Sequence, residues 1–341
     1  MNKHMPYDLA QMQSLPLEAK IIMTQQRIRQ WYEYWDGMVY VSFSGGKDST
    51  VLKHIVDGMY DDVPALFVNT GLEYPEIQKF AMSQPNVVTV RPEMRFDEVL
   101  KIYGYPVISK MVANKVEGAK PENTRWLQLK GQFVNPKTGQ YSQFNIPQWG
   151  FLLDAPFKVS DKCCAVMKKK PAKKYTKESG RKPMLGLMAG ESKARKDAWM
   201  KTGCNAFELK EPQSQPMAFW TEQDVLQYIK KYDVPYCSVY GDIVPADGGE
   251  QIEGQMTTFD LLNEYEGTQL KTTGCNRTGC IFCAFGCHLQ PEPNRFQRLK
   301  ETHPRQYQYC IGGGEMVDGK WQPSKEGLGL GKVLDYINVE Y

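Results

Sequence analysis

The residues with the clearest chemical potential are SFSGGKDST, at positions 42–50, which directly follow the apolar run MVYV. Two adjacent glycines let backbone N–H groups approach an anion closely, and the flanking hydroxyl and lysine side chains add donors. Where a strand precedes such a loop and a helix follows it, the helix N-terminus adds unpaired N–H groups and a partial positive charge. The residues predicted to bind phosphate are Ser44, Gly45, Gly46, Lys47, Asp48, Ser49 and Thr50.

Two common phosphate-binding motifs do not match this stretch. The Walker A pattern GxxxxGK[ST] needs a glycine five residues before Gly46, where this chain has Val41, and a hydroxyl residue after Lys47, where it has Asp48. The dinucleotide pattern GxGxxG fails as well. A plain turn between a strand and a helix is the alternative, but the flanks favour an anion site of another class.

Hydrophobic periodicity predicts the elements that position this loop. Strands are predicted at 38–43, 64–70, 86–90 and 183–189. Helices are predicted at 16–36, 48–60 and 75–82, and from Thr221, where Asp224 completes a capping box. Short strands that alternate with helices indicate parallel βαβ units. We therefore expect an α/β fold with a parallel twisted sheet, helices on both faces, and an irregular cysteine-rich C-terminal region.

Two stretches depart from the alternation of strands and helices. Residues 104–160 are rich in Gly, Pro, Gln and Asn and are interpreted as an insertion, and residues 241–292 show little periodicity. We therefore expect a nucleotide-binding domain over 1–240 and a cysteine-rich, partly helical region over 241–341. GLGLGK, at 327–332, is interpreted as a loop that enters a last helix.

Six of the nine cysteines fall in two tight groups, the pair Cys163-Cys164 and the stretch TGCNRTGCIFCAFGCH at 273–288. In a reducing compartment, such clusters indicate metal binding more than disulfides. Cys280 and Cys283 form a CxxC motif, whose spacing brings both sulfurs to one metal from a single turn. Spacing alone leaves zinc and iron–sulfur open. The isolated cysteines, interpreted as structural, are Cys204, Cys237 and Cys310.

The charge distribution is uneven although the net charge is only +3. Nine Lys or Arg stand against two acids between residues 161 and 182, and a second basic and aromatic stretch covers 294–309. These stretches are either solvated faces or contact surfaces for a phosphate backbone. The first twenty residues hold no apolar core behind a basic start, and no run reaches the ~18 apolar residues of a membrane span. We expect a cytoplasmic protein without a membrane partner.

The stretch SGGKDS fits SGGxDS and resembles the loop of the PP-loop ATP pyrophosphatases, which bind the pyrophosphate portion of ATP and cleave ATP between the α and β phosphates. Three further segments resemble the phosphoadenylyl-sulfate (PAPS) reductase-like branch of that superfamily: NTGLEYPE (69–76), with Asn69 where Asp is usual, GESKAR (190–195) and WTEQDV (220–225). The resemblance covers roughly residues 20–290 and implies an adenine nucleotide α-hydrolase-like, Rossmann-like fold.

The resemblance also implies site residues and cofactors. ATP and Mg²⁺ are expected, with Lys47, Asp48 and Arg195 as the catalytic residues. The further nucleotide-binding residues that it implies are Asn69, Thr70, Gly71, Gly190, Glu191 and Ser192. A tandem CC followed far downstream by CxxC is similar to the pattern that holds a [4Fe-4S] cluster in adenylyl-sulfate reductases. The implied ligands are Cys163, Cys164, Cys280 and Cys283, with Cys275 and Cys287 as alternates and zinc as the alternative metal.

Three functions remain open at this stage. The preferred hypothesis is ATP-dependent thiolation of a nucleic acid, tRNA or DNA, with a sulfur donor or redox partner protein. The first alternative is reduction of a sulfonucleotide to sulfite, for which the related reductases use a cysteine in an ECGLH-like tail, whereas this chain ends in DYINVEY. The second alternative is a nucleotide-binding, cluster-bearing regulatory subunit. An oligomer is compatible with all three.

Overall fold

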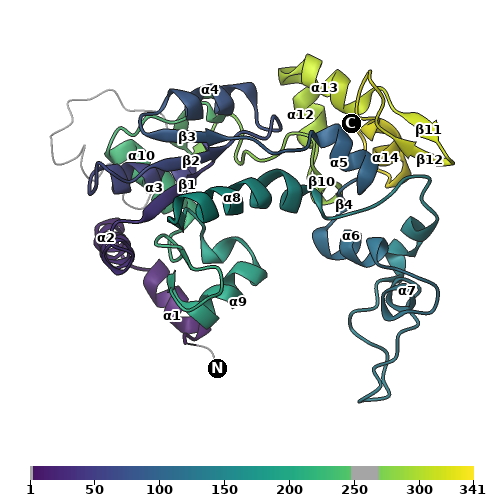
Figure 1. Ribbon diagram of the computed structural model, residues 1–341, viewed down its shortest axis with the longest axis horizontal. Helices are drawn as coiled ribbons and strands as arrows, with labels where there is room; N and C mark the ends of the chain where they lie inside the picture. The colour runs from purple at the N-terminus through teal and green to yellow at the C-terminus, as the bar shows by residue number, and fades with distance from the viewer. Residues whose placement is uncertain (1–2, 247–268) are drawn as a thin grey trace. The chain divides into compact units, whose positions relative to one another are not determined.

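The computed structural model describes residues 3–246 and 269–341, which form two compact units (Figure 1). Unit 1 comprises Met1–Asn69, Glu73–Val90 and Ala172–Thr278, and unit 2 comprises Thr70–Leu72, Arg91–Pro171 and Gly279–Tyr341. Each unit is therefore assembled from three separate stretches of chain, whereas the sequence predicts one boundary after residue 240. Part of the irregular 241–292 stretch lies outside the described residues.

Unit 1 is built on a six-stranded sheet in the order β3-β2-β1-β5-β7-β6. Its strands are β1 (Val39–Phe43), β2 (Ala65–Val68), β3 (Val87–Val90), β5 (Lys182–Leu185), β6 (Asn205–Ala206) and β7 (Gln213–Ser214). Every neighbouring pair is parallel except β6 with β7. A separate antiparallel pair joins β8 (Ile243–Pro245) to β9 (Leu270–Thr272). The mainly parallel sheet confirms the predicted fold class.

The helices of unit 1 connect these strands. They are α1 (Pro6–Gln13), α2 (Leu17–Tyr34), α3 (Lys47–Asp57), α4 (Pro75–Ser83), α9 (Lys193–Thr202) and α10 (Glu222–Lys231), with short 3-10 turns η3 (Ala189–Glu191) and η4 (Ser238–Tyr240). Thr221 caps α10 as predicted: its backbone N–H donates to Asp224 Oδ2 at 2.6 Å, and its hydroxyl accepts from Asp224 N. Lys20 Nζ reaches Asp224 Oδ1 at 2.7 Å, and this buried ion pair joins α2 to α10.

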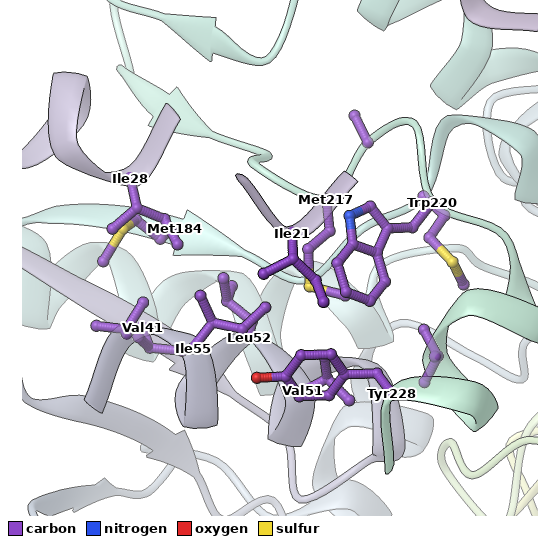
Figure 2. Close-up of a cluster of buried hydrophobic side chains, with 14 of the residues drawn as sticks. Ile21, Ile28, Val41, Val51, Leu52, Ile55, Met184, Met217, Trp220 and Tyr228 are labelled. Atoms are coloured by element: carbon purple, nitrogen blue, oxygen red, sulfur yellow. The ribbon is translucent and has the colours of Figure 1, made fainter. Parts of the chain in front are cut away.

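Both faces of the sheet are covered. On one face, Ile28 of α2 lies beside Met184 of β5, and Leu52 and Ile55 of α3 lie beside Val41 of β1, while Tyr228 of α10 extends the same cluster beside Val51, as Figure 2 shows. Because side chains alternate along a strand, Tyr40 points to the opposite face. There its hydroxyl lies 3.0 Å from Thr176 Oγ1, and its ring packs edge-on against Tyr175, both from α8 (Lys170–Ser179). Burial on both faces explains why β1 is apolar almost throughout.

Unit 2 holds shorter elements. They are α5 (Phe96–Ile102), β4 (Val107–Ile108), α6 (Lys110–Glu117), α7 (Thr124–Leu129), η1 (Pro147–Asp154), η2 (Ala165–Lys169), β10 (Ala284–Phe285), η5 (Cys287–Leu289), α12 (Arg295–Thr302), α13 (Pro304–Ile311), β11 (Glu315–Val317), β12 (Lys320–Gln322) and α14 (Leu330–Tyr336). The predicted insertion at 104–160 thus contributes helices to this unit. The GLGLGK stretch enters the last helix as predicted, and α14 begins within it, at Leu330.

The order of strands determines where a ligand can bind in unit 1. The chain leaves β1 for β2 and β3 on one side and later returns to β5 on the other side. In open parallel sheets, ligands bind beyond the carboxyl ends of the strands at such a reversal. The glycine loop, residues 44–50, begins at this end of β1. No helix in the described ranges 3–246 and 269–341 is long and apolar enough to cross a membrane.

Candidate functional site

The glycine loop makes a tight turn between β1 and α3. Gly45 has a φ of +72°, and a Cβ atom there would lie 3.0 Å from Ile77 Cγ2 and 3.2 Å from the Cβ of Ala81. Only glycine avoids both the backbone strain and the crowding. Ser44 and Ser49 hold the turn together, because Ser44 N donates to Ser49 Oγ at 3.1 Å and Ser49 Oγ donates to the carbonyl of Gly46 at 2.9 Å.

A cavity of about 670 Å³ opens beside this loop and lies wholly within unit 1. The predicted residues that line it are Ser44, Gly46, Lys47, Asp48, Ser49, Gly190, Glu191 and Arg195. The ends of β1 and β5 also contribute, through Ser42 and Leu185. The structure thus brings together segments that are separated by more than a hundred residues in the sequence. This volume is in the range of nucleotide-sized pockets.

Several predicted nucleotide-binding residues do not line the cavity. They are Gly45, Thr50, Asn69, Thr70, Gly71 and Ser192. Thr50 donates its hydroxyl to the carbonyl of Gly46 at 3.0 Å, and Ser192 caps α9 by accepting from Arg195 N. Thr70 and Gly71 belong to unit 2. A nucleotide contact at these positions stays a prediction.

Lys47 is the most buried cation of the cavity, with 5% of its side chain exposed. Its Nζ lies 2.6 Å from Glu222 Oε1 and donates to the carbonyl of Asn276. Its backbone N–H, the first of α3, donates to the hydroxyl of Tyr240 at 3.2 Å. The ammonium group and the backbone N–H of Lys47 therefore both donate to acceptors around the cavity. A bound anion can replace these acceptors.

Asp48 supplies a carboxylate to the same cavity. Burial raises its pKa above the usual range, and the positive charge of Lys47 opposes that shift. Its Oδ1 atom is buried and has no hydrogen-bond partner in the part of the chain that the structure describes. A buried carboxylate oxygen without a proton donor is costly unless a cation or another donor completes it.

Glu191, which also lines the cavity, pairs with two arginine side chains. Its carboxylate forms ion pairs with Arg195 and with Arg277, and it also accepts from the backbone N–H of Met188 at 3.3 Å. Burial lowers the pKa of Arg195, and the positive charge of Arg277 lowers it further. Two like charges are therefore held close together at one carboxylate.

The cavity also contains residues that were not among the predicted site residues, and five of them belong to the polar network around Lys47 and Glu191. They are Glu222, Tyr240, Asn276, Arg277 and Thr278. Glu222 lies in the WTEQDV segment, whose motif was a usable signal. Asn276, Arg277 and Thr278 lie between two cysteines, and a cationic residue among glycines and threonines is a weaker indication of a phosphate contact. Tyr240 had no sequence signal.

Four cysteines meet in a second, smaller cavity, within unit 2. The side chains of Cys163, Cys164, Cys280 and Cys283 line it together with the apolar residues Leu72, Phe96, Pro106 and Met167 and with Lys168. Cys163 and Cys164 directly precede η2, and Cys280 and Cys283 lie in the turn that ends at β10, which pairs with β4. The two groups predicted to share a metal are therefore neighbours in the fold.

Hydrogen bonding sets the protonation of the tandem pair. The Cys163 thiol donates to Cys164 and lowers the pKa of Cys164 to about 6, and the charges of Lys110, Lys168 and Lys169 act in the same direction. The pKa of Cys163 rises, because it keeps the shared proton and is buried. The pair thus holds a thiolate near neutral pH, the form that binds metals.

The two alternate cysteines lie elsewhere. Cys287 is buried, its thiol donates to the carbonyl of Ala284 at 3.0 Å, and burial raises its pKa to about 11. Cys275 belongs to unit 1, where its backbone N–H donates to the carbonyl of Val239. All nine cysteines are described, and none forms a disulfide. Of the nine cysteines, those that line the cysteine cavity are the four that the tandem-plus-CxxC pattern implied, and their role as metal ligands stays a prediction.

Comparisons with known proteins identify a matching family. Residues 38–106 and 122–285 match the family described as the phosphoadenosine phosphosulfate reductase domain. An uncharacterized protein of Methanocaldococcus jannaschii is 28% identical over 124 residues, which cover 34% of this chain and 30% of the relative's length.

Two solved structures show distant similarity. Phosphoadenylyl-sulfate reductase of Candida auris, in a phosphate complex, matches with 18% identity and a TM-score of 0.35, over 63% of this chain and 82% of that chain. The U34-tRNA thiolase NcsA of Methanococcus maripaludis, with its [4Fe-4S] cluster, matches with 14% identity and a TM-score of 0.32, over 86% of this chain and 78% of that chain.

Proposed function

Because the chain belongs to the phosphoadenosine phosphosulfate reductase domain family, we propose that it is a PP-loop enzyme that uses ATP to replace an oxygen of a nucleic acid with sulfur. The single observation that carries this proposal is the cavity of unit 1, where the glycine loop meets three cationic side chains. Lys47, Arg195 and Arg277 suit the high negative charge of a triphosphate. The N-terminus of α3 adds backbone N–H groups to the same wall.

Asp48 favours ATP with Mg²⁺ over a sulfonucleotide. Mg²⁺ binds carboxylate and phosphate oxygens, and the buried Oδ1 of Asp48 provides a carboxylate oxygen beside the polyphosphate-binding loop. A bound Mg²⁺ would also offset the raised pKa of Asp48, because it stabilises the ionised carboxylate. The residue thus fits the expected metal in both position and chemistry.

The cysteine cavity fits an iron–sulfur cluster. Four thiols and an apolar wall surround it, and the tandem pair holds a thiolate near neutral pH. Within the described residues, no group of three or more His, Cys, Asp and Glu side chains could hold a single metal ion. The proposal of a cluster therefore rests on the four thiols of the cavity and on the tandem-plus-CxxC pattern, with zinc as the alternative metal. With a [4Fe-4S] cluster on all four cysteines, sulfide would bind an iron only by displacing one of the four thiolates.

The proposed reaction has two steps and no net redox change. A carbonyl oxygen of the acceptor attacks the α-phosphorus of ATP, the bond to the β-phosphate breaks, and pyrophosphate leaves. Sulfide then attacks the adenylylated carbon, and AMP leaves with the former carbonyl oxygen. Lys47 and the loop N–H groups stabilise the charge that develops on the departing pyrophosphate. Arg195 neutralises phosphate charge during the attack.

Exposed lysines support a nucleic-acid acceptor. Lys169, Lys170, Lys173, Lys174 and Lys177 are exposed along η2 and α8. Carboxylates partly balance two of them, since Lys170 pairs with Glu93 and Lys173 with Glu211, both at 2.5 Å. Exposed pairs of this kind exchange readily for phosphate contacts. A polyanion is therefore the acceptor class that this surface suits.

The direct test is anaerobic incubation of the reconstituted protein with ATP, Mg²⁺, sulfide and bulk tRNA or DNA, followed by nuclease digestion and mass spectrometry. We expect a nucleoside or linkage heavier by the difference between sulfur and oxygen, only when ATP is present. The family also includes sulfonucleotide reductases, so sulfite should be measured with PAPS or adenylyl sulfate and a thiol reductant. Sulfite release without ATP would reject thiolation in favour of reduction.

A further inference from the structure

The segment Asn276–Thr278 makes three contacts with residues that line the nucleotide cavity, one of them directly with the glycine loop. The carbonyl of Asn276 accepts from Lys47 Nζ, and Arg277 pairs with Glu191. Thr278 Oγ1 lies 2.6 Å from the hydroxyl of Tyr240, which accepts the backbone N–H of Lys47. The segment therefore forms a wall of the nucleotide cavity opposite residues that lie 229 positions earlier in the chain.

Arg277 differs from the other two cations in its freedom to move. About two-thirds of its side chain is exposed, against 34% for Arg195 and 5% for Lys47. The Arg277 end of its ion pair with Glu191 is therefore solvated, while the Glu191 carboxylate is only 13% exposed and keeps Arg195 as a second partner. Arg277 can exchange Glu191 for a stronger anion at small cost, whereas Arg195 and Lys47 are held more tightly.

The charges around Glu191 leave room for an additional anion. The Glu191 carboxylate pairs with two guanidinium groups, those of Arg195 and Arg277. Burial lowers the pKa of Arg195, and repulsion from the charge of Arg277 lowers it further. The charge of Arg277 also acts on Asp48, more strongly than that of Arg195. Arg277 thus lies within electrostatic reach of the carboxylate that the glycine loop presents.

We propose that Arg277 is a polyphosphate-binding residue, which leaves Glu191 and contacts the pyrophosphate portion of the nucleotide when ATP binds. This inference rests on the proposed function and deepens it, because it assigns a specific contact to a residue outside the recognised motifs. An arginine forms two parallel hydrogen bonds to phosphate oxygens, which a lysine does not reproduce. Glu191, which the Met188 N–H holds in place, neutralises the guanidinium in the absence of nucleotide.

The test compares three purified variants with the full-length wild type by isothermal titration with ATP–Mg²⁺, with inorganic pyrophosphate and with adenosine. Arg277→Ala should bind ATP and pyrophosphate about 10- to 100-fold more weakly, the loss expected for a charge-assisted contact, and adenosine equally well. Arg277→Lys should fall between the two. Arg29→Ala, an exposed arginine of α2 outside the cavity, is the matched control and should bind like the wild type.

Each outcome bears on the proposal differently. If Arg277→Ala binds ATP and pyrophosphate within twofold of the wild type, this inference is wrong while ATP-dependent thiolation stands. If Arg277→Ala loses adenosine affinity as well, the residue has a structural role and the inference is again wrong. If the wild type binds neither ATP nor pyrophosphate, both this inference and the proposed function fail together.

Discussion

Lys47 is the residue proposed to stabilise the charge on the departing pyrophosphate. It is buried at the helix N-terminus, and its ammonium group lies between Glu222 and the carbonyl of Asn276. Lys47→Ala should reduce pyrophosphate release from ATP at least 100-fold, because a preorganised charge at the leaving group is lost. Lys79→Ala, which removes an exposed lysine of α4, should retain the wild-type rate. Equal rates in the two variants, with both proteins folded, would remove Lys47 from the mechanism.

Tyr240 gives a prediction with a pH dependence. Burial raises the pKa of this phenol to about 12, so the folded state favours its protonated form. The folded state keeps the full benefit below pH 10, the ordinary value, and loses it as pH rises towards 12. Tyr240→Phe should lower the free energy of unfolding by about 1 kcal/mol at neutral pH, because the Lys47 N–H and Thr278 lose a partner.

Urea denaturation at several pH values checks this prediction. The stability difference between the wild type and Tyr240→Phe should shrink between pH 10 and pH 12. Only the wild type has a phenol at this position, and in this pH range that phenol ionises on unfolding, which favours the unfolded state. A difference that stays constant over this range would show that the hydroxyl of Tyr240 is not held in its protonated form.

A site residue can be predicted from the sequence when the residues that define its role are consecutive in the chain. The glycine loop was predicted because its glycines, its lysine and the flanking strand and helix are consecutive in the sequence. Arg277 and Tyr240 reach the cavity only through tertiary packing, and no local pattern records that packing. Asn69, Thr70 and Gly71 show the converse, since a motif resemblance named them but the cavity does not include them.

At the scale of elements, the turn from β1 into α3 depends on Gly45. Gly45→Ala should destabilise the protein by about 2–3 kcal/mol, from a left-handed backbone together with contacts to Ile77 and Ala81. Gly139→Ala provides a matched control: Gly139 has a φ of +68°, but a Cβ atom there meets nothing within 4 Å. It should cost about 1 kcal/mol. Equal thermal-unfolding shifts would show that crowding at Gly45 is unimportant.

Strands and helices with strong periodicity were predicted close to their observed limits. The helix predicted over 48–60 is α3, Lys47–Asp57, and the strand predicted over 38–43 is β1, Val39–Phe43. Burial of one helix face and of both strand faces produces these patterns. Short pairs such as β4 with β10 contain too few residues to show a period, so no sequence pattern indicates that they join distant segments.

At the scale of the whole molecule, substitutions of the cysteines test whether the separate stretches of unit 2 bind one cluster together. Cys163→Ser, Cys164→Ser, Cys280→Ser and Cys283→Ser should each abolish or strongly reduce iron incorporation and the absorbance near about 400 nm after anaerobic reconstitution. Cys275→Ser and Cys287→Ser should retain both signals, because neither residue lines the cysteine cavity. Retention of the full iron content by any of the first four variants would change the assigned ligand set.

The two-unit organisation was beyond the reach of sequence patterns. Each unit combines three stretches, so composition along the chain cannot reveal the division. The stretch from Cys275 to Cys283 was interpreted as one cysteine-rich region, but it passes from unit 1 into unit 2 after Thr278. Arg277 therefore lines the nucleotide cavity, while Cys280, three residues later, lines the cysteine cavity.

The most direct test of the central claim is the fate of ATP labelled at its α-phosphate, which follows AMP or ADP, and in parallel of ATP labelled at its γ-phosphate, which follows pyrophosphate, with and without nucleic acid and sulfide. The proposed function predicts AMP and pyrophosphate in equal amounts, formed in the presence of the acceptor nucleic acid and matched by incorporated sulfur. Formation of ADP, or sulfite release from a sulfonucleotide with no requirement for ATP, would contradict it.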